Sequence, residues 1–137
     1  MRYLTFFSLV FALLAQPGCS SSKPNVPFGH VRGRVTLDGQ PLPNAAVMFE
    51  PATGRPSYGT SSEAGEYTLR YRGQPWGAIA GRHRVRITTE GLFKDSPDAP
   101  TPTVVKEKLP KKYHSATVLT AEVKPGDNII DFDLTTK

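Results

Sequence analysis

Cysteine is nearly absent from this 137-residue sequence, which contains Cys19 alone. A disulfide needs two cysteines, so none can form within the chain. The folded part must therefore be stabilised by a hydrophobic core. Residues 28–137 are numerous enough for one such core, because a domain of about a hundred residues buries roughly 65% of the surface of its unfolded chain.

Long apolar stretches are missing too. The apolar run at residues 4–15 is interrupted only by Thr5 and Ser8, and it is shorter than the roughly 20 residues that a membrane-spanning helix needs. No segment keeps a helical period, whereas 13 prolines and 12 glycines are spread between short apolar runs. Prolines and glycines distributed in this way favour many turns over long helices.

The sequence also lacks the usual motifs of enzyme active sites. Paired carboxylates, a nucleophile elbow and a phosphate-binding loop are all missing. His30, His83 and His114 have no partner at a spacing typical of a metal or acid–base site, and His83 is expected to be a core ring satisfied by a hydrogen bond. We therefore expect no catalytic residue, no metal and no cofactor.

Residues 1–18 have the features of a cleaved export signal. Arg2 supplies a positive charge, the apolar run follows it, and Pro17-Gly18 ends the run. Residues 19–27 are polar and predict a tether that leads to a single domain at residues 28–137.

Gly18-Cys19 resembles the end of a bacterial lipoprotein signal, although Gln16 and Pro17 depart from the usual residues of that motif. The resemblance implies that Cys19 is acylated and holds the protein on a membrane of the cell envelope, facing the periplasm or the cell surface. Acylation would also consume a lone thiol, which is a liability in an oxidising compartment. The alternative is an ordinary signal peptide with an incidental cysteine.

Alternating apolar and polar residues predict short strands. Val31, Val35 and Leu37 share one side of a first strand, and Asp38-Gly39 then favours a type I′ turn. We expect this turn to lead into a second strand at residues 45–49, forming an opening hairpin. Further segments complete the pattern, namely a polar edge strand at 57–62, strands at 67–71 and 83–89, a long surface connection at 90–112 and a closing hairpin of 119–123 with 130–134.

About seven short strands separated by turns are typical of an all-β, antiparallel sandwich. The residues that point outward are arginines on three of the strands, Arg32 and Arg34, Arg70 and Arg72, and Arg84 and Arg86. Asp131 and Asp133 take the same positions on the last strand. Because opposite charges on neighbouring strands attract, we predict that the last strand lies beside an arginine-bearing one.

Several segments follow one another in a recognisable order: Gly33-Arg-Val-Thr-Leu-Asp-Gly-Gln-Pro-Leu, residues 45–51, Ala64-Gly-Glu-Tyr, Gly77-Ala with Gly81-Arg-His-Arg-Val-Arg-Ile, and Leu109-Pro-Lys-Lys-Tyr before Val123-Lys-Pro-Gly-Asp-Asn. In order and spacing they resemble the small planctomycete lipoproteins that carry a carboxypeptidase regulatory-like domain. The resemblance implies a transthyretin-like (prealbumin-like), seven-stranded Greek-key sandwich. It implies no activity, since such domains are generally accessory modules.

An enzymatic alternative comes from the same fold. Hydroxyisourate hydrolases are transthyretin-like and end in Tyr-Arg-Gly-Ser, which Tyr71-Arg72-Gly73 resembles. Here Gln74 replaces the serine, and the C-terminal residues do not supply the motif. We therefore expect a non-enzymatic protein.

The remaining evidence on function is the basic charge. The formal net charge is +5, which indicates attraction to anionic lipid or acidic polysaccharide, or else a solvated face with paired arginines.

Trp76 lies in a loop, where it would stack on a sugar if exposed or cap the sandwich if buried. We expect a monomeric structural or protein-interaction module at the cell envelope, without nucleic acid. The alternative is a carbohydrate- or surface-polymer-binding module that uses Trp76, Arg84 and Arg86.

Overall fold

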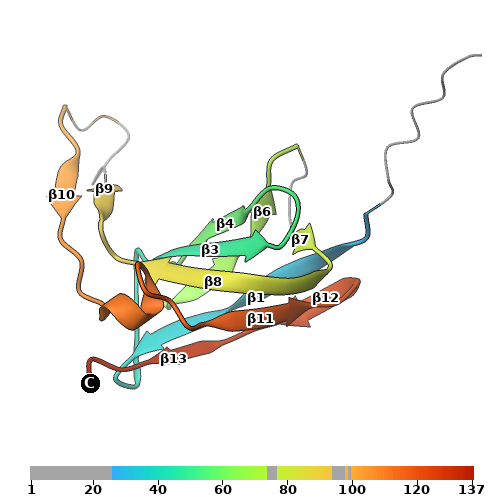
Figure 1. Ribbon diagram of the computed structural model, residues 1–137. Coiled ribbons are helices and arrows are strands. Elements are labelled where there is room, and N and C mark those ends of the chain that lie inside the picture. The colour runs from blue at the N-terminus through green and yellow to red at the C-terminus, as the bar shows by residue number, and fades with distance from the viewer. Residues whose placement is uncertain (1–25, 74–76, 94–97, 99) are drawn as a thin grey trace, which may run out of the picture.

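Two β-sheets packed face to face form the sandwich, and a two-stranded ribbon lies beside them in the described part of the chain (Figure 1). The computed structural model describes residues 26–73, 77–93, 98 and 100–137. The prediction of an all-β sandwich is confirmed. Among the residues that the structure describes, no helix has the length and apolar character needed to cross a membrane.

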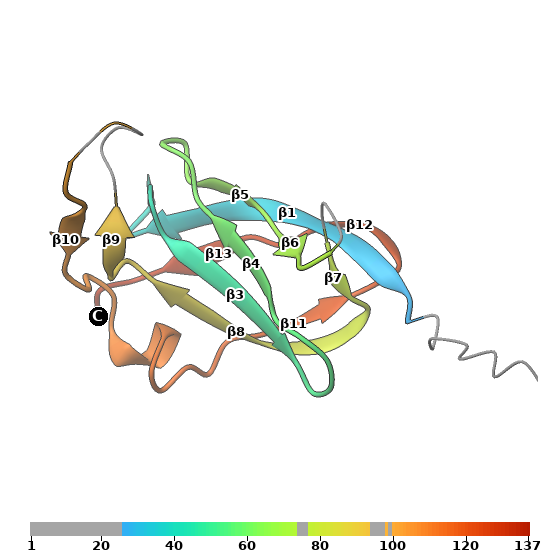
Figure 2. The same ribbon diagram turned by 90° about the horizontal axis from the view of Figure 1, so that it is seen from above.

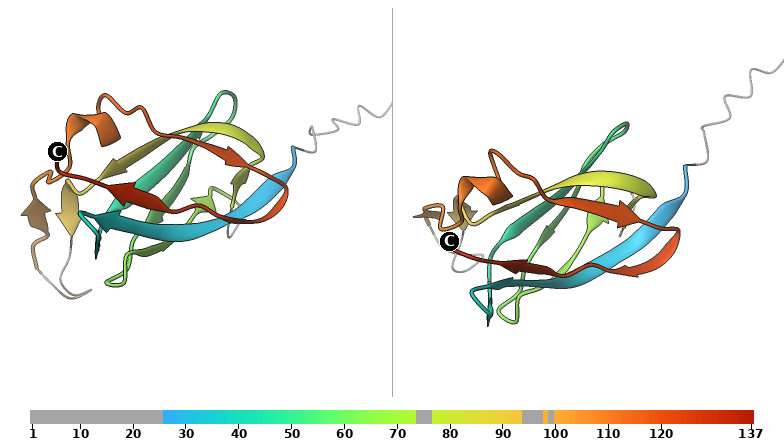
Figure 3. Two further views of the ribbon diagram at one scale, coloured as in Figure 1. Left: turned by 90° about the horizontal axis from the view of Figure 1, so that it is seen from below. Right: turned by 60° about the horizontal axis from the view of Figure 1, so that its bottom comes forward.

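The first sheet is built around β1 (Phe28–Leu37) and is called the β1 sheet. On one side β1 runs parallel to two strands of the C-terminal region, β12 (Gly126–Ile129) and β13 (Phe132–Leu134). On its other side β1 pairs antiparallel with three short strands, β2 (Gln40–Pro41), β5 (Glu66–Thr68) and β7 (Ala78–Ile79). Figure 3 shows β13 alongside β1 from below.

The second sheet, called the β8 sheet, is antiparallel throughout. Its strands lie in the order β11 (Thr120–Val123), β8 (Gly81–Thr88), β3 (Ala46–Pro51), β4 (Ser57–Thr60) and β6 (Arg70–Tyr71). Figure 2 shows β3, β4 and β8 side by side. The predicted strand at 83–89 corresponds to β8, whereas β4 lies between β3 and β6 instead of at an edge.

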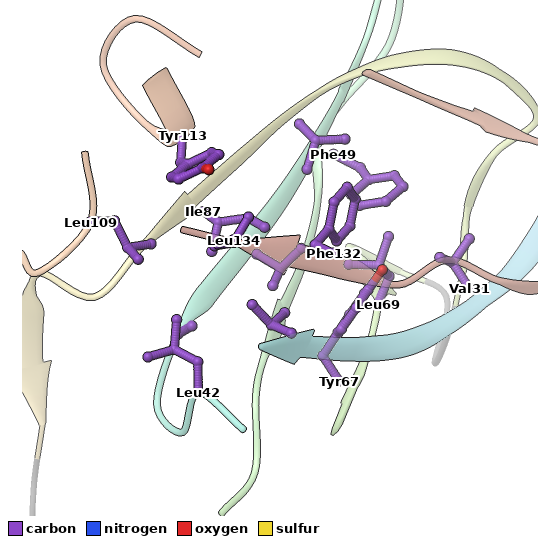
Figure 4. Packing of buried hydrophobic residues seen from close by; sticks show 14 of the residues in the cluster. Val31, Leu42, Phe49, Tyr67, Leu69, Ile87, Leu109, Tyr113, Phe132 and Leu134 are labelled. Atoms are coloured by element: carbon purple, nitrogen blue, oxygen red, sulfur yellow. The ribbon is translucent and has the colours of Figure 1, made fainter. Parts of the chain in front are cut away.

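The core lies between the two sheets (Figure 4). The ring of Phe49 from β3 meets the ring of Phe132 from β13 edge to face, with 6.0 Å between their centroids. Around them pack buried residues from both sheets, including Val31, Val35, Val47, Leu69, Val85, Ile87 and Leu134. Each large side chain contributes about 1.5–3 kcal/mol by leaving water, so this core stabilises the fold without a disulfide.

The opening turn is confirmed, but the opening hairpin is wrong. Asp38 and Gly39 have φ values of 49° and 80°, as a type I′ turn requires. The turn joins β1 only to β2. The chain then crosses to the other sheet at Asn44, whose amide donates to the carbonyl of Ser61, and β3 pairs with β4 and β8.

The closing hairpin is also wrong. β11 pairs with β8, while β12 and β13 pair with β1 in the opposite sheet. Between them the chain turns around Asn128, whose side chain accepts from the Lys124 amide at 2.9 Å and donates to the Lys124 carbonyl at 2.7 Å. Alternation identifies the buried face of a strand, but both inner faces of a sandwich are apolar, so it does not identify the partner strand.

The long connection at 90–112 is not merely a loop. β9 (Gly91–Phe93) and β10 (Thr103–Val105) pair as an antiparallel ribbon that projects beside the sandwich (Figure 1). The 3-10 helix η1 (Lys111–Tyr113) follows it and places Tyr113 against the core. The far end of the connection is therefore part of the packed domain.

Candidate binding surface

Of the three residues proposed from the sequence as ligand-facing, the structure describes Arg84 and Arg86. Arg84 and Arg86 are exposed on the outer side of β8, because their neighbours His83, Val85 and Ile87 are buried on the inner side. Trp76 and Cys19 lie outside the described residues. The candidate surface is therefore built from the outer face of the β8 sheet.

A row of four outward side chains crosses that face. Tyr58 on β4 is paired in register with Arg70 on β6 and with Met48 on β3, and Met48 is paired in register with Arg86 on β8. We call this set (Arg70, Tyr58, Met48 and Arg86) the Tyr58 row. Tyr58 is 56% exposed, although aromatic residues gain most from burial. Three strand spacings of about 4.8 Å separate Arg70 from Arg86, or ~14 Å.

Within the described residues, neither arginine of the Tyr58 row lies in register with an acidic residue. On the same face Arg82 lies opposite Glu122, and Arg84 lies opposite Glu50, so those charges are balanced across the strands. None of these four arginines has a carboxylate oxygen within 4.0 Å among the described residues, so the difference is one of register, since Arg70 and Arg86 lie opposite Tyr58 and Met48. On the strands of this face, the arginines without an in-register carboxylate are thus the two of the Tyr58 row.

An open groove runs along one end of the row. It has a volume of about 740 Å³ and lies where the chain passes from β5 in one sheet to β6 in the other. The side chains along it include Tyr58, Thr60, Thr68, Arg70 and Arg72, together with Glu66, whose carboxylate pairs with Arg34. Leu69, between β5 and β6, is fully buried and anchors this crossing to the core.

The outer face of the β1 sheet differs in charge. The guanidinium of Arg34 pairs with Glu66 at 3.3 Å, and the Asp131 carboxylate accepts from the Arg34 main-chain amide at 2.7 Å. Asp133 accepts from the Thr36 hydroxyl at 2.7 Å. The prediction that the last strand neighbours an arginine-bearing strand is confirmed, but the two carboxylates bind an amide and a hydroxyl, and neither pairs with a guanidinium.

The three histidines serve separate roles. His83 is buried, and its Nε2 donates to the carbonyl of Ile79 at 2.7 Å, as expected of a core ring. His114 Nε2 donates to the carbonyl of Leu109 at 3.0 Å, and His30 Nδ1 lies 3.4 Å from Asp127. No group of three or more potential metal ligands occurs in the described ranges.

Tyr58 and Met48 were not predicted from the sequence as surface residues of interest. Residues 57–62 were interpreted only as a polar strand, although an aromatic residue at an outward position was a usable signal. Met48 carries no such signal, because it lies inside the apolar run of β3. Its position in the row follows from the pairing of β3 with both β4 and β8.

Comparison with known protein families gives no match, and comparison with curated proteins gives none either. Among solved structures, the fold is similar to a DUF3823 family protein from Parabacteroides merdae, with 15% sequence identity and a TM-score of 0.45. The alignment covers 82% of this chain and 48% of that chain, so the chain spans about half the length of this neighbour.

Proposed function

We propose that this chain is an exported, non-enzymatic lipoprotein whose β-sandwich serves as an interaction module at the cell envelope. The Tyr58 row carries the proposal, because aromatic and arginine side chains are enriched at protein interfaces, and the row exposes Tyr58 beside Arg70 with Arg86 at its other end. The segment order that resembles carboxypeptidase regulatory-like domains supports the same function. Those domains are generally accessory modules without an activity of their own.

The anchor in this proposal is an acyl group on Cys19. Stable attachment needs two or more acyl chains, since one chain gives only marginal binding. The test is the intact mass and detergent partition of the full chain expressed in a bacterium that processes lipoproteins, beside Cys19→Ser. We expect the wild type to begin at Cys19 with added acyl mass and only the variant to be soluble. Two soluble proteins without added mass would contradict the anchor.

The interaction surface needs a test that does not depend on the anchor. The full chain with Cys19→Ser is mixed with washed envelopes of the cells that make the protein, and the mixture is sedimented. We expect retention that falls strongly when Tyr58→Ala is added and persists with Ile129→Ala, an exposed apolar position on the outer face of the β1 sheet. Equal retention of both variants would contradict this surface.

A specific observation favours the second candidate, a module for carbohydrate or surface polymer. Tyr58 and Met48 form an apolar platform between the two arginines of the row. A protein partner would use the same residues, but an aromatic ring on an open strand face is also suited to stacking on a sugar ring.

A further inference from the structure

We infer that the Tyr58 row binds a linear polysaccharide bearing carboxylate groups. The inference rests on the proposed function as an interaction module and names the chemical class of the partner. Its basis is the order of groups across the β8 sheet: a cation at Arg70, an aromatic ring at Tyr58, an apolar side chain at Met48 and a second cation at Arg86.

The two positive charges of the row favour a ligand with several negative charges. Guanidinium is planar and always protonated, and it binds a carboxylate with two parallel hydrogen bonds. Arg70 and Arg86 have no described carboxylate within 4.0 Å, so their donors are open to a ligand. A separation of ~14 Å between the two arginines, set by three strand spacings, suits charges that recur along a chain.

The centre of the row indicates which part of the ligand lies between its two negative charges. Tyr58 is 56% exposed, and its in-register neighbour on β3 is Met48, which is half-buried. The C–H groups on one face of a sugar ring pack well against such a platform, whereas a simple anion gains nothing from it. A sugar polymer with acidic groups matches both parts of the row.

An anionic membrane fits this face less well. A bilayer would contact the sheet as a plane, where Arg84 and Arg82 lie opposite Glu50 and Glu122 and add no net positive charge. The unpaired charge follows a line across the strands, which is the shape of an extended polymer.

The test titrates oligogalacturonate into the full chain carrying Cys19→Ser, so that no acyl group contributes to binding. Neutral cello-oligosaccharide of the same length and vesicles containing phosphatidylglycerol are the comparison ligands. Calorimetry measures the affinity at fixed salt. We expect binding to oligogalacturonate alone, weakened about tenfold by Arg70→Gln, Arg86→Gln or Tyr58→Ala, as the loss of one charged hydrogen bond or stacking contact predicts.

Arg32→Gln is the matched control, because it removes the same charge from the exposed outer side of β1. Circular dichroism shows whether each variant is folded, and Tyr58→Phe, which keeps the ring, is expected to bind within about twofold of the parent. Equal losses for Arg32→Gln and Arg86→Gln, or binding to vesicles instead of the uronate, would overturn the inference. If the uronate does not bind but washed envelopes still retain the chain through Tyr58, the ligand class is wrong and the proposed function stands.

Discussion

The carboxylate of Asp131 accepts a hydrogen bond of 2.7 Å from the main-chain amide of Arg34. The contact lies between β12 and β13, where Ile130 and Asp131 interrupt the pairing with β1 although the register is the same on both sides. Asp131 thereby substitutes for the carbonyl that a regular strand would offer. Its role is to hold the register of the parallel C-terminal strands.

Asp131→Ala is expected to lower the free energy of unfolding by about 1 kcal/mol, the typical net value of one hydrogen bond. Asp131→Asn keeps an acceptor oxygen and should cost less. Arg34→Gln keeps the main-chain amide, so it should cost less than Asp131→Ala. Urea unfolding measures all three. A cost for Arg34→Gln as large as that for Asp131→Ala would show that the guanidinium, and not the amide, is the partner.

Gly33 lies against Ile130 in the same segment. A Cβ at this position would stand 1.8 Å from the carbonyl oxygen of Ile130, and a main-chain atom cannot move aside as a flexible side chain does. We expect Gly33→Ala to destabilise the protein by about 3 kcal/mol, visible as a large fall in the thermal midpoint. Gly39→Asn is the control, because nothing lies within 4 Å of a Cβ there and asparagine tolerates a positive φ. Equal midpoints for the two variants would contradict the clash.

Glu107 ties the end of the long connection to β8. Its carboxylate accepts from the hydroxyls of Thr88 and Thr89 and from the amides of Thr89, Lys108 and Leu109. Burial raises the pKa of this carboxyl, but the hydrogen bonds outweigh burial and lower the pKa to about 2, from an ordinary value of 4.5.

This pKa predicts how stability depends on pH. Between pH 4.5 and about 2 the Glu107 carboxyl binds a proton in the unfolded chain and not in the folded one. The stabilisation of the folded state by ionised Glu107 is therefore complete above pH 4.5, and it is lost as the pH falls toward about 2. Urea midpoints across this range should fall less steeply for Glu107→Gln than for the wild type. Glu90→Gln, at an exposed position, should follow the wild type, and parallel curves for all three proteins would contradict the role of Glu107.

Burial was easier to predict from the sequence than pairing. The alternation of His83, Val85 and Ile87 gave the inner face of β8 correctly, and Asp38-Gly39 gave the turn, because both depend on neighbours in the chain. The partners of residues 45–49 and 119–123 depend on which sheet each strand joins. That choice is made by local features such as Asn44 and Asn128, whose hydrogen bonds turn the chain between the sheets.

For the candidate surface too, the sequence predicted which residues point outward but not which residues lie side by side. The outward position of Arg84 and Arg86 follows from alternation and is confirmed. The Tyr58 row was not predictable, because it combines one residue from each of four strands, β6, β4, β3 and β8. Sequence patterns do not show that residues 48, 58, 70 and 86 share one line, since that line depends on the register of three strand pairs.

The most direct test of the Tyr58 row as an interaction surface is photocrosslinking in the cells that make the protein. A benzophenone amino acid replaces Tyr58 in one full-length variant and Ile129 in another, since both side chains are exposed, at 56% and 68%, on opposite outer faces of the sandwich. Benzophenone reacts with C–H bonds of proteins and sugars alike. We predict an adduct of increased mass from position 58 and none from position 129. Adducts from position 129 alone, or equal amounts from both positions, would contradict the assignment of this face.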